Sequence, residues 1–423
     1  MNEYFNELGR FNYWNGCLPE CGTARKSYTN RMLGYVGNKL VKVLVGQRGT
    51  GKGTLLRQIA RYLIEEGVSP RNILHINKAF TDSGVLTDRA DLEELLSTYQ
   101  EKVHPIGKIY LLIEEIQNIE GWEQFVHAHS QDNVASCELF ISGSHRSMLL
   151  AGTESVMAKY TVSFEVFPFS YAEYVGMRRD EASGKSYAGY MEGNSSLPEL
   201  VGLPSDELRQ KTVMAIRNTV LLRDVIQRYR IKDARLLEDV MVYLFTHLTE
   251  LVSITDLVRH FSAQNRKTSY DTVVNYIRVL EDTFLLHRVE RFQIKNKEVV
   301  LGSCKYYCND WSLPRYLYPF FVYSQASRLE NQVFLELRRA GYSVYTGVLR
   351  TRMIDFVARK GDRILYLQCA PSLADEVLLN QLYLSLEAIQ DNYEKWVVSL
   401  DQVTLPSKEG IRHIQAWRLG GML

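Results

Sequence analysis

The segment that most restricts the fold of this 423-residue chain is a glycine-rich run, GQRGTGKGT, at residues 46–54. An apolar stretch, LVKVLV, precedes it, and apolar residues follow it at helical spacing in TLLRQIARYLI. This pattern predicts a strand, a tight loop and a helix. In such a loop, backbone N–H groups wrap phosphate oxygens at the start of the helix, where the helix dipole favours anions. We therefore expect a nucleotide-binding domain.

The run fits G-x-x-x-x-G-K without a shift, so Lys52 is expected to reach the outer phosphates. The pattern departs at Gly53, where a Ser or Thr normally holds Mg²⁺, and Thr54 supplies the next hydroxyl. A glycine-rich turn without a ligand is the alternative. The expected ligands are ATP and Mg²⁺. The expected nucleotide-binding residues are Gly46, Gln47, Arg48, Gly49, Thr50, Gly51, Lys52, Gly53, Thr54 and Ser144.

Two consecutive glutamates end the apolar stretch KIYLLIEE. Hydrolysis needs one carboxylate for the metal and another to orient or deprotonate the attacking water. We assign Glu114, with Thr54, to the metal and Glu115 to the base, because the carboxyl end of a parallel strand faces the phosphates. Solvated charges that open a loop are the alternative. After the next strand, Ser144 could sense the γ-phosphate and Arg146 could neutralise charge, although an ordinary surface arginine is equally compatible.

Short apolar stretches alternate with helical periodicity as far as residue 144. Strands are expected at 72–77, 108–115 and 138–144, and helices near 91–103 and 120–130. Alternation of this kind predicts a parallel sheet with right-handed crossovers. The expected fold class is α/β, with a P-loop NTPase sheet and an N-terminal extension in residues 1–205.

Between about 176 and 208 the sequence is rich in Gly, Ser, Asn, Glu and Pro, which predicts an irregular connection and a boundary near 205. Residues 206 to about 285 then follow a helical pattern, at the start of a domain expected over 206–322. A helix, a basic turn, a second helix and two short strands within 206–322 predict a winged-helix domain. The residues expected to contact double-stranded DNA are Arg266, Lys267, Thr268, Tyr270 and Asn275. A lid or a surface for a protein partner is the alternative, because acidic residues dilute the positive charge of the second helix.

Residues 323–423 predict a small separate α/β domain. With Glu330 or Glu336 on its first helix and Asp355 on its second strand, it resembles the restriction-endonuclease-like core. Nucleases of that type need an acidic residue, a spacer and a lysine on the third strand to hold Mg²⁺ and activate water. The sequence has QCA at 368–370 instead. We therefore expect a catalytically inactive domain in which Asp355 is a structural remnant.

Several motifs spread over nearly the whole chain, and together they resemble the AAA+-like ATPases of bacteria and archaea that carry a carboxy-terminal domain of unknown function. The motifs are GQRGTGKGTLLRQIA, LLIEEIQNIEGWEQF, LFISGSHRSML, VFPFSYAEY, LLRDVIQRY, TVVNYIRVLEDTFLLHRVERF, KYYCND and RLENQVFLELRRAGYSVY. The resemblance implies an acidic motif of Asp-Glu, an apolar residue and Gln, which Glu115 and Gln117 match while Glu114 replaces the aspartate. It also implies a Gly-Arg pair where this chain has Ala158 and Lys159.

Two functions remain open at this point. The first is an ATPase or an ATP-dependent switch that acts through the winged-helix domain. The second is a DNA- or protein-binding regulator that holds nucleotide with little or no hydrolysis. The Lys-Gly-Thr sequence is also similar to adenylate kinases, so a nucleotide kinase is a third and weaker alternative.

Composition excludes few classes. Lys and Arg number 50 against 49 Asp and Glu, so no global field attracts nucleic acid or an anionic membrane. No apolar stretch approaches the roughly 18 residues of a membrane span, and the first residues do not follow a signal-peptide pattern. We expect a cytoplasmic protein with no membrane partner. The six cysteines match neither a disulfide framework nor common zinc spacing, which predicts reduced, unligated thiols.

Overall fold

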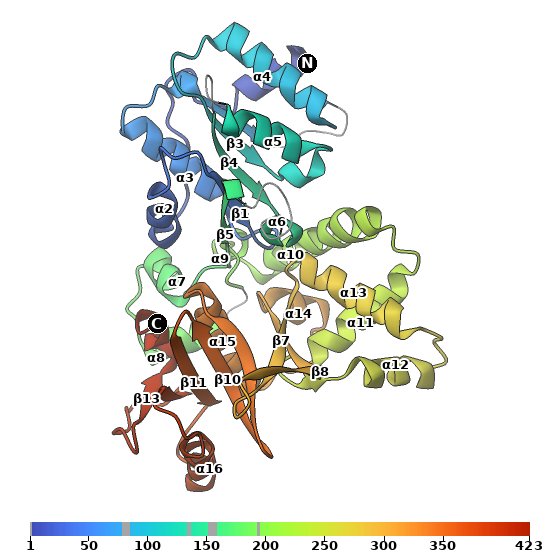
Figure 1. Ribbon diagram of the computed structural model, residues 1–423, viewed down its shortest axis with the longest axis vertical. Helices are drawn as coiled ribbons and strands as arrows, with labels where there is room; N and C mark the ends of the chain where they lie inside the picture. The colour runs from blue at the N-terminus through green and yellow to red at the C-terminus, as the bar shows by residue number, and fades with distance from the viewer. Residues whose placement is uncertain (1, 78–84, 133–136, 151–158, 193–194) are drawn as a thin grey trace. The chain divides into compact units, whose positions relative to one another are not determined.

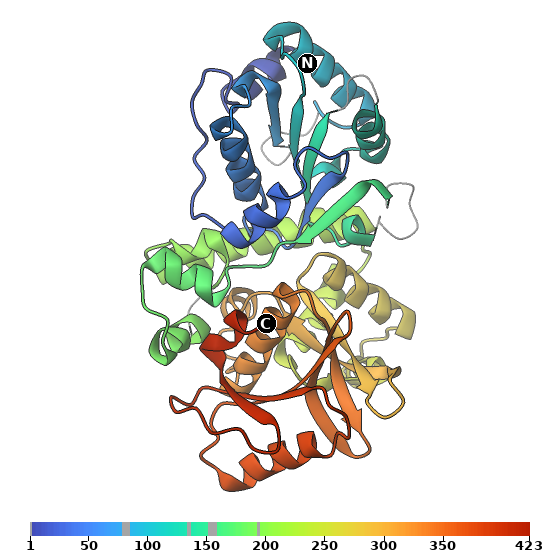
Figure 2. The ribbon, with the colours of Figure 1, turned by 60° about the vertical axis from the view of Figure 1, so that its left-hand side comes forward.

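The computed structural model describes residues 2–77, 85–132, 137–150, 159–192 and 195–423 (Figures 1 and 2). The chain divides into two compact units, residues 1–166 and 167–423. The boundaries expected near 205 and 322 do not coincide with this division. Each unit has its own sheet, and each is described by itself.

The first unit is built on a sheet of five parallel strands in the order β2-β3-β4-β1-β5. The strands are β1 (Val41–Val45), β2 (Ile73–Asn77), β3 (Tyr110–Glu114), β4 (Glu138–Gly143) and β5 (Thr161–Glu165). Every residue of β1 and β4 is buried, as in a parallel sheet covered on both faces. The expected parallel sheet is confirmed, with β5 as a strand that the sequence pattern did not indicate.

Helices cover both faces of this sheet (Figures 1 and 2). Helix α3 lies on one face, where Leu55, Leu56 and Ile59 pack with β-strand residues and with α2. Helices α4 and α5 lie together on the other face. The helical elements are α1 (Asn2–Gly9), α2 (Lys26–Leu33), α3 (Lys52–Glu65), η1 (Pro70–Asn72), α4 (Arg89–Val103), η2 (Ile116–Asn118), α5 (Trp122–Gln131) and α6 (Ser147–Leu150).

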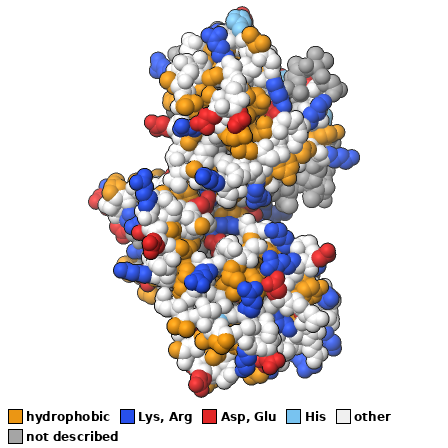
Figure 3. Space-filling view, turned by 90° about the vertical axis from the view of Figure 1, so that its left-hand side faces the viewer, with side chains coloured by type: hydrophobic (Ala, Val, Ile, Leu, Met, Phe, Trp, Pro, Cys, Tyr) orange, Lys and Arg blue, Asp and Glu red, His pale blue; other side chains and the backbone are white. Residues whose placement is uncertain are grey.

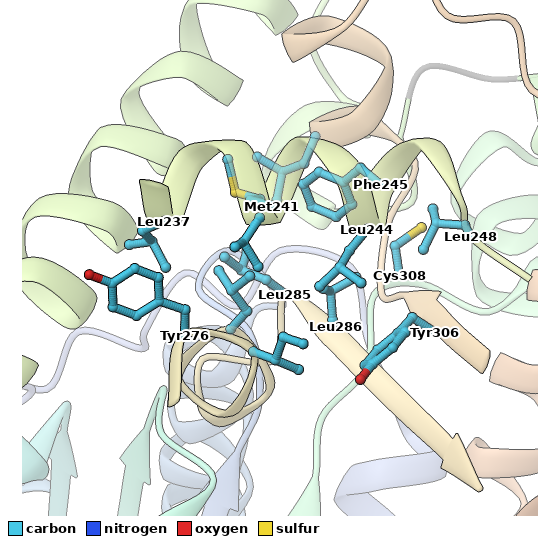
Figure 4. Close-up of a cluster of buried hydrophobic side chains, with 14 of the residues drawn as sticks. Leu237, Met241, Leu244, Phe245, Leu248, Tyr276, Leu285, Leu286, Tyr306 and Cys308 are labelled. Atoms are coloured by element: carbon cyan, nitrogen blue, oxygen red, sulfur yellow. The ribbon is translucent and has the colours of Figure 1, made fainter. Parts of the chain in front are cut away.

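The second unit begins with a run of helices around its own apolar core (Figure 4). Leu237 of α11 lies beside Tyr276, and Leu244 of the same helix lies beside Leu286. The helical elements are α7 (Tyr171–Arg178), α8 (Gly184–Glu192), α9 (Pro198–Val201), α10 (Asp206–Thr219), the π-helical η4 (Val220–Gln227), α11 (Ala234–Thr246), α12 (Ile254–Ala263), α13 (Tyr270–Asp282) and α14 (Ser312–Leu317).

The irregular connection expected at 176–208 is wrong, because α8 and α9 occupy much of it. Tyr187, Tyr190 and Met191 of α8 are buried in the core that surrounds Tyr171. Their burial stabilises a helix that the local Gly and Ser content disfavours. Composition alone could not reveal this tertiary contact.

An eight-stranded sheet in the order β13-β12-β11-β10-β9-β7-β8-β6 runs through the rest of the second unit. The two strands expected as a wing are β7 and β8, and β7 pairs in parallel with β9, as in the register of Arg291 with Thr346. Residues 206–322 and 323–423 therefore share one sheet. The strands are β6 (Leu251–Val252), β7 (Leu286–Gln293), β8 (Glu298–Cys308), β9 (Ser343–Leu349), β10 (Arg352–Lys360), β11 (Arg363–Ala370), β12 (Glu394–Ser399) and β13 (Ile411–Gln415).

Three helical elements pack with these strands: α15 (Gln325–Arg339), α16 (Glu376–Glu387) and η5 (Ala416–Gly421). Helix α15 packs through Leu329, Val333 and Leu337 against the core that contains Phe356 and Leu367. Helix α16 buries Leu382 and Leu386 in a second cluster, which also contains Val397.

The surface mixes both signs of charge. Figure 3 shows Lys and Arg interspersed with Asp and Glu over one face of the molecule. Among the described residues, no helix combines the length and the apolarity needed to span a membrane.

Candidate nucleotide-binding site

The carboxyl ends of the parallel strands in the first unit bring the expected site residues to one edge of the sheet. Val45 is in register with Gly143, and Asn77 is in register with Glu114. The phosphate loop follows Val45, while Glu115 and Ser144 follow the ends of β3 and β4. In open α/β sheets this edge is where ligands bind.

The loop turns into α3 at Gly51, which has a positive φ of 86° that favours glycine. Lys52 is the first residue of the helix, and its side chain is 5% exposed. Its Nζ donates to the carbonyls of Gly46 at 2.9 Å and Gln47 at 3.0 Å. The lysine is thus held over its own loop, where an anion would meet it together with the backbone N–H groups.

Glu115 lies at the centre of a polar cluster beside the loop. Its carboxylate lies 3.7 Å from Lys52 Nζ and 3.4 Å from Arg48 Nη2. Ser144 Oγ donates to Glu115 Oε2 at 2.7 Å, and Gln117 Nε2 donates to the same oxygen at 2.8 Å. The structure therefore brings together five of the residues that the sequence motifs had singled out.

Glu115 is held as a carboxylate. Burial favours its neutral form, but the charges of Lys52 and Arg48 and the hydrogen bonds from Ser144 and Gln117 outweigh it, so its pKa is below the ordinary value. Its φ of 52° is uncommon for a residue other than glycine. Conformations of this kind concentrate at functional sites, which agrees with the predicted base role.

Glu114 belongs to a different hydrogen-bonded chain. Its Oε1 lies 2.9 Å from His75 Nε2, and His75 Nδ1 lies 2.9 Å from the hydroxyl of Tyr13. Asn12 fixes the backbone of His75 by accepting from its N–H at 2.8 Å and donating to its carbonyl at 3.0 Å. The N-terminal extension therefore supports the acidic strand. Sequence reasoning missed His75, Asn12 and Tyr13, and no motif identifies them.

Thr54 and Glu114 line the same pocket, which has a volume of about 780 Å³. His75 and Asn77 line it from β2, Arg57 lines it from α3, and residues 4–22 line it from the N-terminal extension. Thr54 Oγ1 accepts a hydrogen bond from Arg57 Nη2 at 3.1 Å. The two residues predicted to hold the metal thus face one cavity.

The loop also has features that fit a bound phosphate. Both side-chain amide atoms of Gln47 are buried, and neither has a hydrogen-bond partner among the described residues. Buried polar groups are normally satisfied, so this amide is available to a ligand. Arg25, which the sequence reading missed, is 1% exposed and donates to the Thr50 carbonyl at 2.8 Å. This hydrogen bond holds the loop backbone at Thr50.

The structure locates Arg146 and Lys159 but does not assign a role to either. Arg146 lies partly buried in the turn between β4 and α6, so its charge-neutralising role stays a prediction. Lys159 lies just before β5, and Ala158 falls outside the described residues.

The predicted DNA-contacting residues lie around the start of α13 in the second unit. Lys267, Thr268 and Asn275 line a hollow of about 720 Å³ together with Arg230 and Lys232. Tyr270 is exposed. Arg266 pairs with Asp239.

The C-terminal sheet contains a second cluster of charged residues. Lys305 Nζ of β8 lies 2.7 Å from Glu330 Oε1 of α15. Burial, and next the negative charge of Glu330, raise the pKa of Asp355 in β10 to about 7, although Lys305 opposes this. Glu336 instead pairs with Arg339 at 2.9 Å. The sequence reading did not associate Lys305 with these carboxylates.

Two family models match separate parts of the chain. Residues 38–175 match the family described as "AAA domain", and residues 194–323 match a domain of unknown function, DUF8612. An uncharacterized protein of Haemophilus influenzae is 29% identical over 381 residues, which cover 89% of this chain and 93% of that protein. An uncharacterized protein of Methanocaldococcus jannaschii is 23% identical over 323 residues, 71% of this chain and 67% of that protein.

Solved structures show looser similarity. The Thermotoga maritima RuvB Holliday junction branch migration motor is 16% identical, with a TM-score of 0.31, over 64% of this chain and 93% of that one. Cdc6p from Pyrobaculum aerophilum is 15% identical, with a TM-score of 0.28, over 64% and 89% of the two chains. The parallel sheet and the phosphate loop give the first unit a P-loop NTPase fold, and residues 38–175 within and beyond it match the "AAA domain" family.

Proposed function

We propose that this protein binds ATP with Mg²⁺ at the phosphate loop and hydrolyses it, with Glu115 as the general base. The observation that carries this proposal is the Glu115 cluster, in which a buried carboxylate with a lowered pKa lies beside the loop lysine. A base held ionised and oriented by Ser144 and Gln117 suits the deprotonation of an attacking water.

Different groups of the loop would bind different phosphates of the nucleotide. Backbone N–H groups of residues 46–51 and the Gln47 amide would bind phosphate oxygens, and Lys52 would leave the Gly46 and Gln47 carbonyls for the outer phosphates. Glu114 and Thr54 would hold Mg²⁺, which neutralises charge on the phosphates when it is bound. No cluster of three or more His, Cys, Asp or Glu arranged for a metal occurs in the described parts of the chain, so phosphate and water would complete its coordination.

A nucleotide-held regulator is the second candidate, because Glu115 is paired with Lys52 and Arg48 in this structure. Lys52 and Arg48 would stabilise bound phosphate, and their pairing with Glu115 would hinder it from accepting a proton from water. The partner would be double-stranded DNA or a protein that contacts the start of α13, where Lys267, Arg230 and Lys232 line one hollow. We place the protein in the cytoplasm.

The test measures ATP binding and hydrolysis with Mg²⁺ for the wild type and Lys52→Ala, with and without double-stranded DNA. We expect turnover that is lost in Lys52→Ala and that rises with DNA. Tight binding without turnover would support the regulator. Acceptor-dependent formation of ADP would support the nucleotide kinase instead, and a wild type that does not bind ATP would refute the proposal.

A further inference from the structure

Two departures from the ordinary loop pattern face each other in this site. Gly53 stands where Ser or Thr is usual, and Glu114 stands where an aspartate is usual. A β-carbon built on Gly53 would lie 2.3 Å from Glu114 Oε2 and 2.7 Å from its Cδ and Oε1. The Glu114 carboxylate therefore fills the space that any side chain at position 53 would need.

The carboxylate is not free to swing aside at low cost. The Glu114 residue is 9% exposed, and its Oε1 is bonded to His75 at 2.9 Å. His75 is itself 7% exposed and is fixed at its other ring nitrogen by Tyr13. A side chain at position 53 would have to break this chain of buried hydrogen bonds or leave a carboxylate without its partner.

We infer that Gly53 and Glu114 are a coupled pair, in which the glutamate carboxylate takes the metal-facing place that a hydroxyl at position 53 would occupy. The packing part of this inference stands on the structure alone, and the metal part rests on the proposed function. Glutamate is one methylene longer than aspartate, which lets its carboxylate reach the first turn of α3. A carboxylate oxygen is also a hard ligand of the kind that Mg²⁺ binds.

Thr54 is the other residue that could replace the missing hydroxyl. Neighbouring positions on a helix point about 100° apart, so the Thr54 side chain does not share the direction of position 53. Its hydroxyl already accepts a hydrogen bond from Arg57. Glu114 is therefore the better substitute.

The experiment is a double-mutant cycle on the full-length protein, with Gly53→Ser, Glu114→Asp and the two combined. Affinity for a fluorescent ATP analogue is measured in Mg²⁺ and in EDTA, and the ratio of the two affinities reports the metal. We expect each single variant to lower this ratio about tenfold or more. We expect the combination, which rebuilds the ordinary hydroxyl and aspartate pair, to return it to within about threefold of the wild type.

A matched variant, Gly53→Ala/Glu114→Asp, separates packing from metal binding. It adds the β-carbon without the hydroxyl, so we expect it to recover the melting temperature of the Ser/Asp combination but not the ratio. Additive losses in the Ser/Asp combination would overturn the coupling. A Gly53→Ser variant that keeps the wild-type melting temperature and ratio would overturn it as well.

Folding failure of Gly53→Ser alone would leave the inference testable. Neither Glu114→Asp nor the Ser/Asp combination has the clash. The inference therefore requires the combination, which adds the hydroxyl, to have a higher Mg²⁺-to-EDTA affinity ratio than Glu114→Asp alone. A wild type that binds the analogue in neither Mg²⁺ nor EDTA would contradict the proposed function. In that case the melting temperatures would still show whether Gly53 and Glu114 are coupled through packing.

Discussion

Lys52 in the first unit and Lys305 in the second each lie beside a glutamate, yet the two clusters shift the pKa of a carboxylate in opposite directions. Glu115 is shared by two cations, Lys52 and Arg48, and its pKa is lowered. Around Lys305, one cation serves two carboxylates, Glu330 and Asp355, and the pKa of Asp355 is raised to about 7. Burial raises the pKa in both clusters, but the two cations and the hydrogen bonds at Glu115 outweigh it, whereas Glu330 adds to it at Asp355.

The chemistry follows from this difference. An excess of positive charge beside a glycine loop suits an anionic ligand and a base that stays ionised. A deficit of positive charge between strands leaves one carboxylate protonated near neutral pH. The structural role of Asp355 stays a prediction, and cleavage by this part of the chain stays outside the proposed function.

The largest effect is expected for Glu115→Gln, which removes the base from the first cluster. The turnover number for ATP should fall by about 10²–10⁴-fold, because proton transfer from water is lost. ATP affinity should stay the same or increase, because one negative charge leaves the phosphate site. Steady-state hydrolysis measures the turnover and equilibrium binding measures the affinity, with Glu123→Gln, at an exposed position of α5, as the control. Unchanged turnover would remove Glu115 from the mechanism.

Lys305→Met should destabilise the second unit by about 3–5 kcal/mol, because it leaves the buried Glu330 charge without a cation, with only the Tyr307 hydroxyl still donating to it. Urea unfolding at neutral pH measures this loss, and Lys295→Met at an exposed position is the control. Adding Glu330→Gln should recover part of it. A loss as small as that of the control would show that the pair contributes little.

Asp355→Asn tests the raised pKa. The folded state holds the Asp355 proton more tightly than the unfolded chain, so the wild type loses unfolding free energy as pH rises from about 4 to about 7. The variant lacks this loss and should gain about 1–2 kcal/mol relative to the wild type over that range, because Asp355 is only partly buried. Chemical unfolding at several pH values measures the difference, with exposed Asp362→Asn as the control. A difference that does not vary with pH would contradict the assignment.

The smallest effect is expected for Ser144→Ala, which removes the 2.7 Å hydrogen bond to Glu115. A loss of about 1 kcal/mol should raise the pKa of Glu115 and lower turnover by roughly fivefold. Glu115 works as a base only when it is ionised, so the variant should lose activity at a higher pH than the wild type as the solution is acidified. The pH–rate profile measures this, and an acid limb that does not move would place Ser144 outside the control of Glu115.

The first unit could be predicted because its signals are local. The loop at 46–54 and the glutamates at 114 and 115 each sit next to a strand whose apolar residues are contiguous in sequence. Strand ends in a parallel sheet meet at one edge, so their proximity followed from the fold class alone. The metal-facing space was harder to predict, since the contact between Gly53 and Glu114 depends on side-chain length.

The support of the site and the sheet of the second unit could not be predicted in this way. Tyr13 and His75 meet across 62 residues, and β7 and β9 pair through Arg291 and Thr346. Neither contact leaves a periodicity or a spacing in the sequence. The helix α8 was missed for the same reason, because its stability comes from tertiary burial of Tyr187 and Tyr190.

The pairing of β7 with β9 has a mechanical consequence. Strand β7 is bonded to β8 on one side and to β9 on the other, so no edge separates the helical part from the C-terminal part. Bending between them would expose unpaired backbone N–H and C=O groups. A pull applied at α13 must therefore travel through this ladder to β9, and the second unit would transmit force as one stiff piece, with any hinge outside its sheet.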